Sequence, residues 1–358
     1  MKDLKDLRIG YLPGSPDFSA PCDRRRFVRY AQSRGLQIES ADPRVKYDLL
    51  VLSQRADLSV WSRYPHRDTR IVFDCVDSYL AADGWKARLR GLAKFITRRS
   101  RYLQLSHREA VARMCRRADA VICSTDEQRA LISGYNPNVR LILDVHDEDV
   151  AVVKQNYDSG KVFHFVWEGL ASSGIPLGQM RELLEPIARE REIALHIVTD
   201  LVYHRFLDKV DRRYTVDDVR KVFGPLASRV YLYDWNSFAL SRIAVAADLA
   251  LIPIDLTNTF HRGKPENKLL LFWRMGVPTL TSATPSYIRA MRLAGLDMAC
   301  ADSGEWRDRL GRYMADAALR RQAGQAGLET ARKHYSGADM LRRWEQLFES
   351  LFDARQAA

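Results

Sequence analysis

The sequence predicts an α/β protein built from two doubly wound parallel sheets. Its 358 residues exceed what one hydrophobic core usually organises and suit two domains of ordinary size. Near-continuous apolar runs alternate with helical patterns, as they do in parallel sheets that are covered on both faces. These runs form two series, separated by a polar segment at 144–161 that ends near Asp-Ser-Gly.

Each predicted strand is a short apolar run bounded by polar or turn residues. The first series lies at 7–14, 47–53, 69–77, 118–125 and 139–145. The second series lies at 161–169, 193–200, 229–235, 247–254, 277–282 and 296–302. After Asp302 the pattern is helical to the end of the sequence. We therefore expect one domain over 1–155, a second over 156–335 and a terminal helix over 336–358.

The composition is that of an ordinary globular protein, with 46% hydrophobic and 28% charged residues. The five cysteines are scattered and never form C-x-x-C, which argues against a zinc site or a disulfide framework and fits a reducing compartment. No apolar run approaches the ~20 residues that a membrane span requires, and the N-terminal residues do not resemble a signal peptide. We therefore expect a cytoplasmic protein.

The segment GKPENKLLLFWRMG at 263–276 predicts a helix with an unusual first turn. Residues 269–273 are apolar on every side, so we expect them to be buried all round. Lys268 stands in the first turn, where a positive charge opposes the helix macrodipole by about 0.3–1 kcal/mol. A diphosphate at the carboxyl edge of the sheet would be bound by free N–H groups and Lys268 together. The alternative is a lysine that merely extends into solvent.

Six segments of the chain occur in the order typical of one family. KLLLFWRMGVPTLTS (268–282) is similar to the K-x-x-E-x-x-A-x-G-x-P-V-V-x-S segment of GT-B glycosyltransferases, in particular the retaining group 1 (family 4) type. The other segments that resemble family motifs are FDCVD (73–77), ADAVICST (118–125), VWEG (166–169), ADLALIPI (247–254) and ARKHYSGADMLRRWEQLFESL (331–351). The resemblance implies the GT-B fold: two Rossmann-like domains that face each other across a cleft, with C-terminal helices that cross back to the N-terminal domain.

Two positions depart from the family's pattern. The glutamate that usually binds the donor ribose falls on Leu271, and the other half of the family's E-x7-E pattern falls on Gly263. Glu266, at the same helix start, is our candidate for the ribose contact. The resemblance therefore implies a fold and a reaction class, but it does not name the sugar, the nucleotide base, the acceptor or the oligomeric state.

The predicted donor-binding residues come from loops at strand ends and from the helix that starts near 267. Asn267 and Lys268 would meet the diphosphate, with Arg262 as a looser candidate. The residues expected to line the nucleotide are Gly169, Thr199, Asp200 and Trp235. Trp235 would stack on the base, and its alternative is plain packing under the next helix.

A run of hydroxyl side chains follows the strand at 277–282. Ser282 and its neighbours Thr281 and Thr284 would be able to donate to phosphate oxygens. We favour the alternative, a helix cap for residues 285–294, because Pro285 suits the first helical position.

In the first domain, Gly14 follows the first strand, where the backbone must approach an acceptor or turn sharply. Asp74 and Asp77 end the strand at 69–77. An inverting enzyme would need one of them as a general base for the acceptor hydroxyl, whereas the resemblance to retaining enzymes implies that the leaving phosphate takes that proton. The structural alternative for Asp77 is a cap of the following segment.

Asp147-Glu148-Asp149 matches the D-x-D motif with which GT-A glycosyltransferases bind a divalent metal. It follows the last strand of the first series and precedes a full second series. We interpret it as domain-boundary surface and predict no metal and no other cofactor. Activity that EDTA abolished and Mn²⁺ restored would reverse this interpretation.

The net charge of +11 is concentrated in one window, because eleven Lys or Arg residues and a single acid lie between Lys86 and Arg117. Lys86, Arg90, Lys94 and Arg98 accompany an apolar stripe that begins at Trp85. A basic amphipathic helix of this kind is typical of an interfacial contact with an anionic membrane. The alternative is a solvated helix that packs on the domain through the same stripe.

We expect a glycosyltransferase that moves a sugar from a nucleotide-sugar donor to a glycan or lipid-linked acceptor, in bacterial surface polysaccharide or lipopolysaccharide assembly. It would work at the cytoplasmic face of the inner membrane. One alternative is a nucleotide-sugar epimerase of the same fold. Another is a basic nucleic-acid-binding protein, but no binding motif accompanies the charge, so we expect no nucleic-acid partner.

Overall fold

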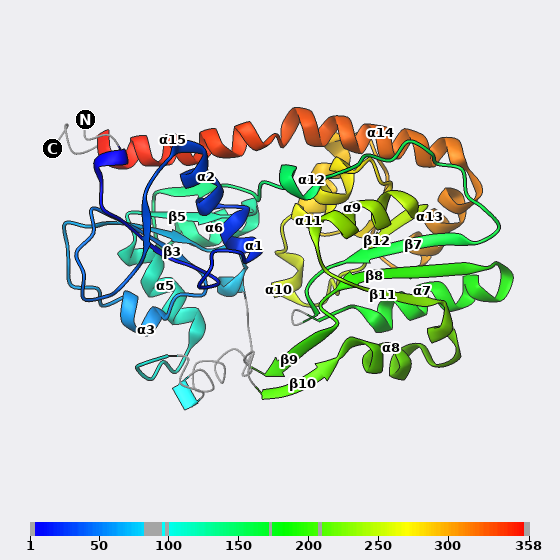
Figure 1. Cartoon of the computed structure of the whole chain (residues 1–358), viewed down its shortest axis with the longest axis horizontal. Coiled ribbons are helices and arrows are strands. Elements are labelled where there is room, and N and C mark those ends of the chain that lie inside the picture. The colour runs from blue at the N-terminus through cyan, green and yellow to red at the C-terminus, as the bar shows by residue number, and fades with distance from the viewer. Residues whose placement is uncertain (1–3, 82–94, 97–99, 172–173, 207–209, 354–358) are drawn as a thin grey trace. The chain divides into compact units, whose positions relative to one another are not determined.

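The computed structural model describes residues 4–81, 95–96, 100–171, 174–206 and 210–353 (Figure 1). The chain separates into two compact units. The first unit comprises residues 1–145, 258–265 and 337–358, and the second comprises 146–257 and 266–336. Each unit contains its own six-stranded sheet in which every strand pair is parallel. The predicted fold class of two doubly wound parallel sheets is therefore confirmed.

The sheet of the first unit has the order β2-β1-β3-β4-β5-β6. Its strands are β1 Ile9–Leu12, β2 Ile38–Ser40, β3 Leu49–Ser53, β4 Arg70–Asp74, β5 Ala120–Cys123 and β6 Val139–Leu141. The helical elements of this unit are η1 Leu4–Asp6, α1 Pro21–Arg24, α2 Phe27–Arg34, α3 Leu58–Trp61, η2 Tyr79–Ala81, α5 His107–Arg117, α6 Asp126–Ser133, α10 Thr259–Arg262 and α15 Gly337–Asp353.

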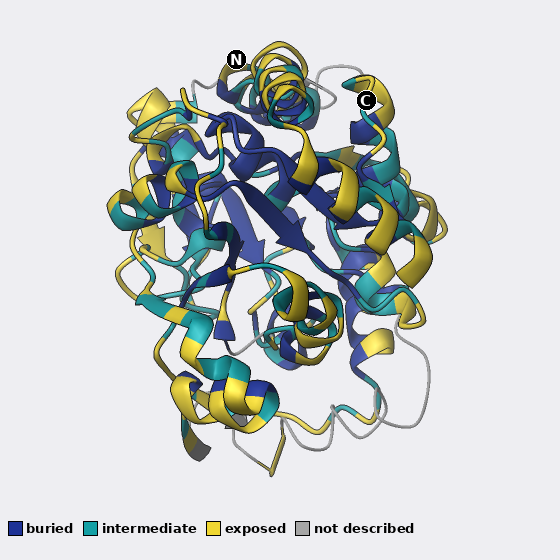
Figure 2. Ribbon diagram, turned by 90° about the vertical axis from the view of Figure 1, so that its right-hand side faces the viewer, coloured by how far each residue is buried: buried dark blue, intermediate teal, exposed yellow. Residues whose placement is uncertain are grey.

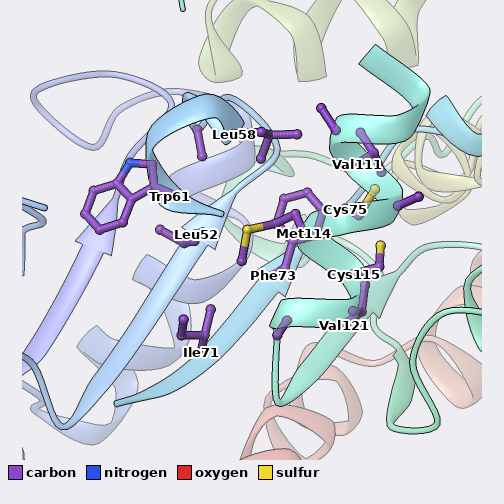
Figure 3. Packing of buried hydrophobic residues seen from close by; sticks show 14 of the residues in the cluster. Leu52, Leu58, Trp61, Ile71, Phe73, Cys75, Val111, Met114, Cys115 and Val121 are labelled. Atoms are coloured by element: carbon purple, nitrogen blue, oxygen red, sulfur yellow. The ribbon is translucent and has the colours of Figure 1, made fainter. Parts of the chain in front are cut away.

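Two hydrophobic layers cover this sheet. On one face, Phe73 of β4 lies beside Met114 of α5, and Leu52 of β3 and Trp61 of α3 belong to the same hydrophobic cluster (Figure 3). On the other face, α2 packs against α15, where the rings of Phe27 and Trp344 lie 5.6 Å apart. The C-terminal helix thus belongs to the first unit by its contacts, as the resemblance implied.

The sheet of the second unit has the order β11-β8-β7-β12-β13-β14. Its strands are β7 Phe163–Glu168, β8 Ile193–Thr199, β11 Val230–Asp234, β12 Leu249–Ile252, β13 Thr279–Ser282 and β14 Ala299–Cys300, with an antiparallel hairpin of β9 Val202–Phe206 and β10 Val210–Tyr214. The helical elements are η3 Asp147–Asp149, α7 Leu177–Glu190, α8 Thr215–Phe223, η5 Gly224–Arg229, α9 Ser237–Ala246, α11 Asn267–Arg274, α12 Pro285–Leu293, α13 Ser303–Ala315 and α14 Ala317–His334.

Every strand predicted from an apolar run is present, and the central strands of the two sheets are buried (Figure 2). Two features were not predicted. The strand β2 is short and mainly exposed, and the hairpin β9–β10 is rich in charged residues. Neither has the continuous apolar run that marks a strand buried on both faces. The segment between β1 and β2 forms two helices, α1 and α2.

The contacts change units after Val145 rather than after residue 155. Residues 146–155 pack on the second unit, where the Lys154 ammonium donates to the carbonyl oxygens of Val245 and Ala247 at 2.9 and 2.8 Å. The interpretation of 147–149 as surface is wrong for Asp149, whose side chain is buried. Asp147 is half exposed and forms an ion pair with the buried Arg274, which requires a counter-charge.

The predicted basic helix, including Lys86, Arg90, Lys94 and Arg98, lies outside the described residues. Within the described ranges, no helix is long and apolar enough to cross a membrane.

Candidate functional site

Helix α11 is buried all round, as its sequence predicts. Each side chain from Leu269 to Trp273 is at most 1% exposed. The helix packs between the sheet and α14. Gly327 of α14 allows this close approach, because a Cβ there would lie 2.6 Å from the Trp273 ring. The beginning of α11 is therefore held rigidly at the carboxyl edge of the sheet, next to the ends of β7 and β12.

Lys268 contacts the end of β7. Its Nζ lies 4.3 Å from the centre of the Trp167 ring, a cation–π geometry. Gly169 lies against the same ammonium, since a Cβ at this glycine would stand 2.5 Å from Lys268 Nζ and 2.8 Å from the Trp167 ring. The absence of a side chain at Gly169 therefore leaves room for the ammonium, and the Lys268 side chain packs on this strand end instead of merely extending into solvent.

The N-terminal turn of α11 carries no side-chain cap from its N-cap residue, Glu266. Glu266 is buried, as is Glu168 at the end of β7. Burial raises the pKa of the Tyr287 hydroxyl well above its usual value, and the charges of Glu266 and Glu168 raise it further. The carboxylates of Glu266 and Glu168 therefore lie near Tyr287 of α12, beside the lysine. Asn267 is half buried as the first residue of α11.

Trp235 follows β11 and is held by a hydrogen bond from its Nε1 to Glu168 Oε1 at 3.0 Å. This contact goes beyond plain packing, because it fixes the plane of the indole at the carboxyl edge of the sheet. The sequence singled out Trp235 but not Glu168, although Glu168 stands directly before Gly169. The sequence did contain a signal for Glu168, namely an acidic residue at the end of an apolar strand and directly before a glycine.

Thr199 and Asp200 end the neighbouring strand β8. Within the described part of the chain, Thr199 Oγ1 is buried and has no hydrogen-bond partner. Asp200 accepts a hydrogen bond from the backbone N–H of Ala171 at 3.2 Å, which anchors the loop after β7. Burial raises the pKa of the Asp200 carboxyl, and Asp234 and Glu168 raise it further.

Ser282 and Thr284 serve the backbone. Ser282 Oγ accepts from the N–H of Ile254 at 2.8 Å and so ties the end of β13 to the loop after β12. Thr284 is the N-cap of α12 and accepts from the N–H of Tyr287, with Pro285 in the first turn. The predicted helix cap is therefore confirmed. Arg262 lies at the end of α10, is exposed, and groups with the first unit rather than with α11.

In the first unit, Gly14 is part of a tight turn over α1. Its N–H donates to Asp23 Oδ1 at 2.7 Å, and the side chain of Cys22 occupies the space that a Cβ at Gly14 would need. Asp23 is fully buried and also accepts from the Tyr11 hydroxyl at 2.6 Å. Packing of the turn therefore accounts for this glycine.

Asp74 is held in a buried ion pair. Its two oxygens accept from Arg26 Nη2 and Nε at 2.6 and 2.7 Å. Arg26 also pairs with Asp144 at 2.9 Å and donates to the carbonyl of Ile142. Asp74 is also buried, at 4% exposure, so an acceptor hydroxyl has no access to its carboxylate, and of the two aspartates we retain only Asp77 as a candidate general base.

Asp77 lies just beyond β4 and is half buried. Gln54 makes two bonds with it: Gln54 Nε2 donates to Asp77 Oδ2 at 2.9 Å, and Gln54 Oε1 accepts from the Asp77 N–H at 2.8 Å. Lys264 is close enough for its charge to interact with Asp77. Burial lowers the pKa of Lys264, and the Asp77 carboxylate partly offsets this. Sequence reasoning missed both partners.

Lys264 reaches Asp77 because residues 258–265 pack on the first unit. Ser78 Oγ donates to the carbonyl of Gly263 at 3.0 Å, and Thr259 Oγ1 donates to the carbonyl of Ala81 at 2.9 Å. The ring of Phe260 lies 5.5 Å from that of Tyr79. Within the described ranges, no group of three or more His, Cys, Asp or Glu side chains is placed to bind a metal ion.

Two doubly wound parallel sheets, with a C-terminal helix returning to the first, define the GT-B class. The chain has the fold of GT-B glycosyltransferases, and comparison with solved structures shows this directly. HepE of Anabaena, solved in complex with UDP and glucose, aligns with a TM-score of 0.61 over 96% of this chain and 100% of its own, at 10% identity.

WaaG, a glycosyltransferase involved in lipopolysaccharide biosynthesis, aligns with a TM-score of 0.58 over 96% of this chain and 99% of its own, at 12% identity. TarM aligns with a TM-score of 0.59 at 11% identity, but this chain spans only 54% of TarM. The sequence matches no family model and no curated protein. Similarity at this level of identity establishes the fold.

Proposed function

We propose that the protein is a glycosyltransferase that moves a sugar from a nucleotide-sugar donor to a glycan or lipid-linked acceptor. One observation carries the proposal: the Lys268 ammonium stands in the first turn of α11, held against Trp167 and Gly169 at the carboxyl edge of the sheet. Sugar transfer leaves negative charge on the departing diphosphate. A preorganised ammonium beside the N–H groups of a helix N-terminus stabilises that charge as it develops.

The other donor contacts follow from this placement. Asn267 and the N–H groups of α11 bind the diphosphate with Lys268, and Glu266 binds the ribose hydroxyls. Trp235, fixed by Glu168, packs beside the base. The complex of HepE with UDP and glucose supports a donor of this class.

Asp77 is the residue that we assign to the acceptor. We propose a retaining, metal-independent transfer in which the leaving phosphate takes the acceptor proton, and Asp77 with Lys264 orients the acceptor hydroxyl. The support is the family resemblance together with the electrostatic interaction between Asp77 and Lys264. Proton NMR of the first-formed product reads its anomeric configuration directly. An inverted product would assign Asp77 the general-base role, and activity that depended on Mn²⁺ after EDTA treatment would contradict metal independence.

We place the reaction in bacterial surface polysaccharide or lipopolysaccharide assembly, at the cytoplasmic face of the membrane. The support is the similarity to WaaG and the basic sequence window around Lys86, Arg90 and Lys94. Phosphatidylglycerol vesicles should bind the protein in a salt-sensitive manner. The triple substitution of these residues to Glu should abolish that binding, and equal binding to neutral vesicles would contradict the idea.

Nucleotide binding tests the proposed donor site. Thermal-shift measurements with UDP, GDP, TDP and CMP sugars should give a shift for one base. Lys268→Ala should remain folded and lose the shift with the corresponding nucleoside diphosphate, because a charged hydrogen bond is worth about 1.5–3 kcal/mol. This corresponds to roughly 10- to 100-fold weaker binding.

Lys161→Ala is the matched control. Lys161 precedes the amino end of β7, and its side chain is 85% exposed. This variant should bind the nucleotide as the wild type does. An unchanged shift in Lys268→Ala would overturn the donor assignment.

A further inference from the structure

The second unit contains a cavity of about 750 Å³ that takes no part in the sites described above, apart from the shared wall residue Ser282. It lies between α7 and α13 and extends over the ends of β12 and β14; we call it the α7–α13 groove. Its walls are mainly apolar and include Leu183 and Ile187 on α7 and Leu310 and Met314 on α13. The volume is that of a typical small-molecule site.

Two helix-destabilising residues stand on opposite walls of the groove. Pro186 lies inside α7, where it removes one backbone hydrogen bond of the helix. Gly311 lies inside α13, where glycine is less favourable than alanine. A Cβ at Gly311 would meet no heavy atom within 4 Å. The packing of the chain therefore does not require this glycine, in contrast to Gly327.

Gly311 keeps open a space that any side chain would narrow. Opposite it, the missing N–H of Pro186 leaves the carbonyl of Glu182 without its usual helical donor, on a wall that includes both residues. The groove follows α7 from Gln179 to Glu190, a length of roughly 16 Å at 1.5 Å per residue. Such a long and apolar space fits an extended aliphatic chain better than a compact polar metabolite.

The charged residues around the groove determine which head group such a chain can carry. Its acidic residues are Glu182, Glu190, Asp255 and Asp302, and its basic residues are Arg191 and Arg307. Arg191 already serves the fold, because it donates to the carbonyl of Met314 and lies 5.1 Å above the Phe163 ring. Asp255 and Asp302 also serve the fold, because Oδ1 of Asp255 accepts from Thr257 and Oδ1 of Asp302 caps α13. With four acidic residues against two basic ones, the rim repels a phosphate or carboxylate and offers carboxylate oxygens to hydroxyl groups.

We propose that the α7–α13 groove binds the aliphatic chain of a neutral glycolipid. The chain lies between the two helices, against Leu183, Leu310 and Met314. The hydroxylated head lies at the carboxyl end of the strands, where Asp255 and Asp302 accept its hydrogen bonds. This site is separate from the proposed transferase activity, and its occupancy does not depend on Lys268 or on a nucleotide.

Calorimetric titration with octyl glucoside below its micellar concentration tests the site, with octyl phosphate as the anionic probe of the same chain length. The full-length wild type should bind octyl glucoside, and octyl phosphate should bind at least tenfold more weakly. Equal or tighter binding of octyl phosphate would overturn the assignment of a neutral head group. Failure of the nucleotide to bind in the thermal-shift experiment would leave this result unaffected.

Gly311→Leu should weaken octyl glucoside binding at least tenfold while keeping or raising the melting temperature, because leucine favours helix and enters empty space. Gly178→Leu is the matched control: Gly178 also lies in a helix with nothing within 4 Å of its Cβ position, but it does not line the groove. It should bind the probe as the wild type does. Wild-type affinity in Gly311→Leu, or equal losses in both variants, would contradict the proposal.

Discussion

Ser78 and Gly263 fit together so closely that no side chain can stand at residue 263. Ser78 Oγ donates to the carbonyl of Gly263 at 3.0 Å, and a Cβ at Gly263 would lie 2.7 Å from Ser78 Cβ. This contact explains in physical terms why the position that resembles a glutamate of the E-x7-E pattern holds a glycine. It also places Lys264, the next residue, within range of electrostatic interaction with Asp77.

Substitution of Gly263 by Ala should detach residues 258–265 from Ser78, because the added methyl group overlaps the serine. Overpacking of this kind costs about 1–3 kcal/mol. We expect faster amide hydrogen exchange in 258–265, measured by mass spectrometry. The double variant Gly263→Ala with Ser78→Gly should recover most of the protection. Normal protection in Gly263→Ala alone would show that the contact does not hold the segment.

Gly169→Ala should weaken nucleoside diphosphate binding without unfolding the protein. A Cβ at residue 169 meets the end of a flexible side chain, Lys268 Nζ at 2.5 Å, as well as the Trp167 ring. We expect the ammonium to move and the dissociation constant of the diphosphate to rise about tenfold, measured by calorimetry. Gly160→Ala is the control, since the nearest atom to its Cβ lies 4.0 Å away. Equal affinities in the two variants would argue that Gly169 has no role in placing Lys268.

Asp74→Asn and Asp77→Asn should separate structure from catalysis. Loss of the Asp74 charge leaves Arg26 buried without its main partner, which costs about 3–5 kcal/mol of unfolding free energy. Asp77 is half buried and hydrogen-bonded to Gln54, so Asp77→Asn should change stability by less than about 1 kcal/mol.

The kinetics of Asp77→Asn then report on mechanism. For a retaining transfer, kcat should fall less than about tenfold, because the leaving phosphate takes the proton. A general base contributes about 10²–10⁴-fold. A fall of that size, with the acidic limb of the pH profile lost, would identify an inverting reaction. Denaturant unfolding and initial-rate measurements on the same preparations give both readouts.

His196 should make the second unit sensitive to acid. Its ring lies between His164 and Tyr233, with nitrogen-to-partner distances of 2.9 and 3.0 Å. Burial, and then the neighbouring His164, lowers the pKa of His196 to about 4. In the unfolded chain the pKa is about 6.5. Between pH 4 and pH 6.5 the unfolded state binds a proton at His196 that the native state does not bind. The contribution of His196 to the free energy of unfolding is therefore fully present above pH 6.5 and is lost as the pH falls toward 4.

The expected loss from pH 7 to pH 5 is at most about 2 kcal/mol for this group. His196→Phe keeps a ring against Tyr231, whose centroid lies 5.3 Å away, and removes the titration. The variant should lose correspondingly less stability than the wild type over the same pH interval, measured by urea unfolding. Parallel losses in the two proteins would mean that His196 is protonated normally in the native state.

The fold could be predicted because its signal is local. An apolar run of four to eight residues predicts a buried parallel strand wherever its partners lie, and the run at 269–273 predicts a helix buried on every side. The hairpin β9–β10 was not predicted, because charged residues interrupt the apolar residues of both its strands. For the candidate site, position at strand and helix ends singled out Lys268, Trp235 and Gly169 in the sequence, and their role stays a prediction. The structure adds Trp167, Glu168 and Lys264, which no local pattern marked.

The sequence by itself determined the two parallel sheets, the buried helix with its lysine and the Thr284 cap, because each depends on residues that are neighbours along the chain. Only the tertiary structure decided which charges pair. Arg26 pairs with Asp74, which is 48 residues away in the sequence. Asp77 instead accepts a hydrogen bond from Gln54 and interacts electrostatically with Lys264. Such pairings depend on which side chains the packing of distant segments brings into one low-dielectric space, where a buried charge must find a partner.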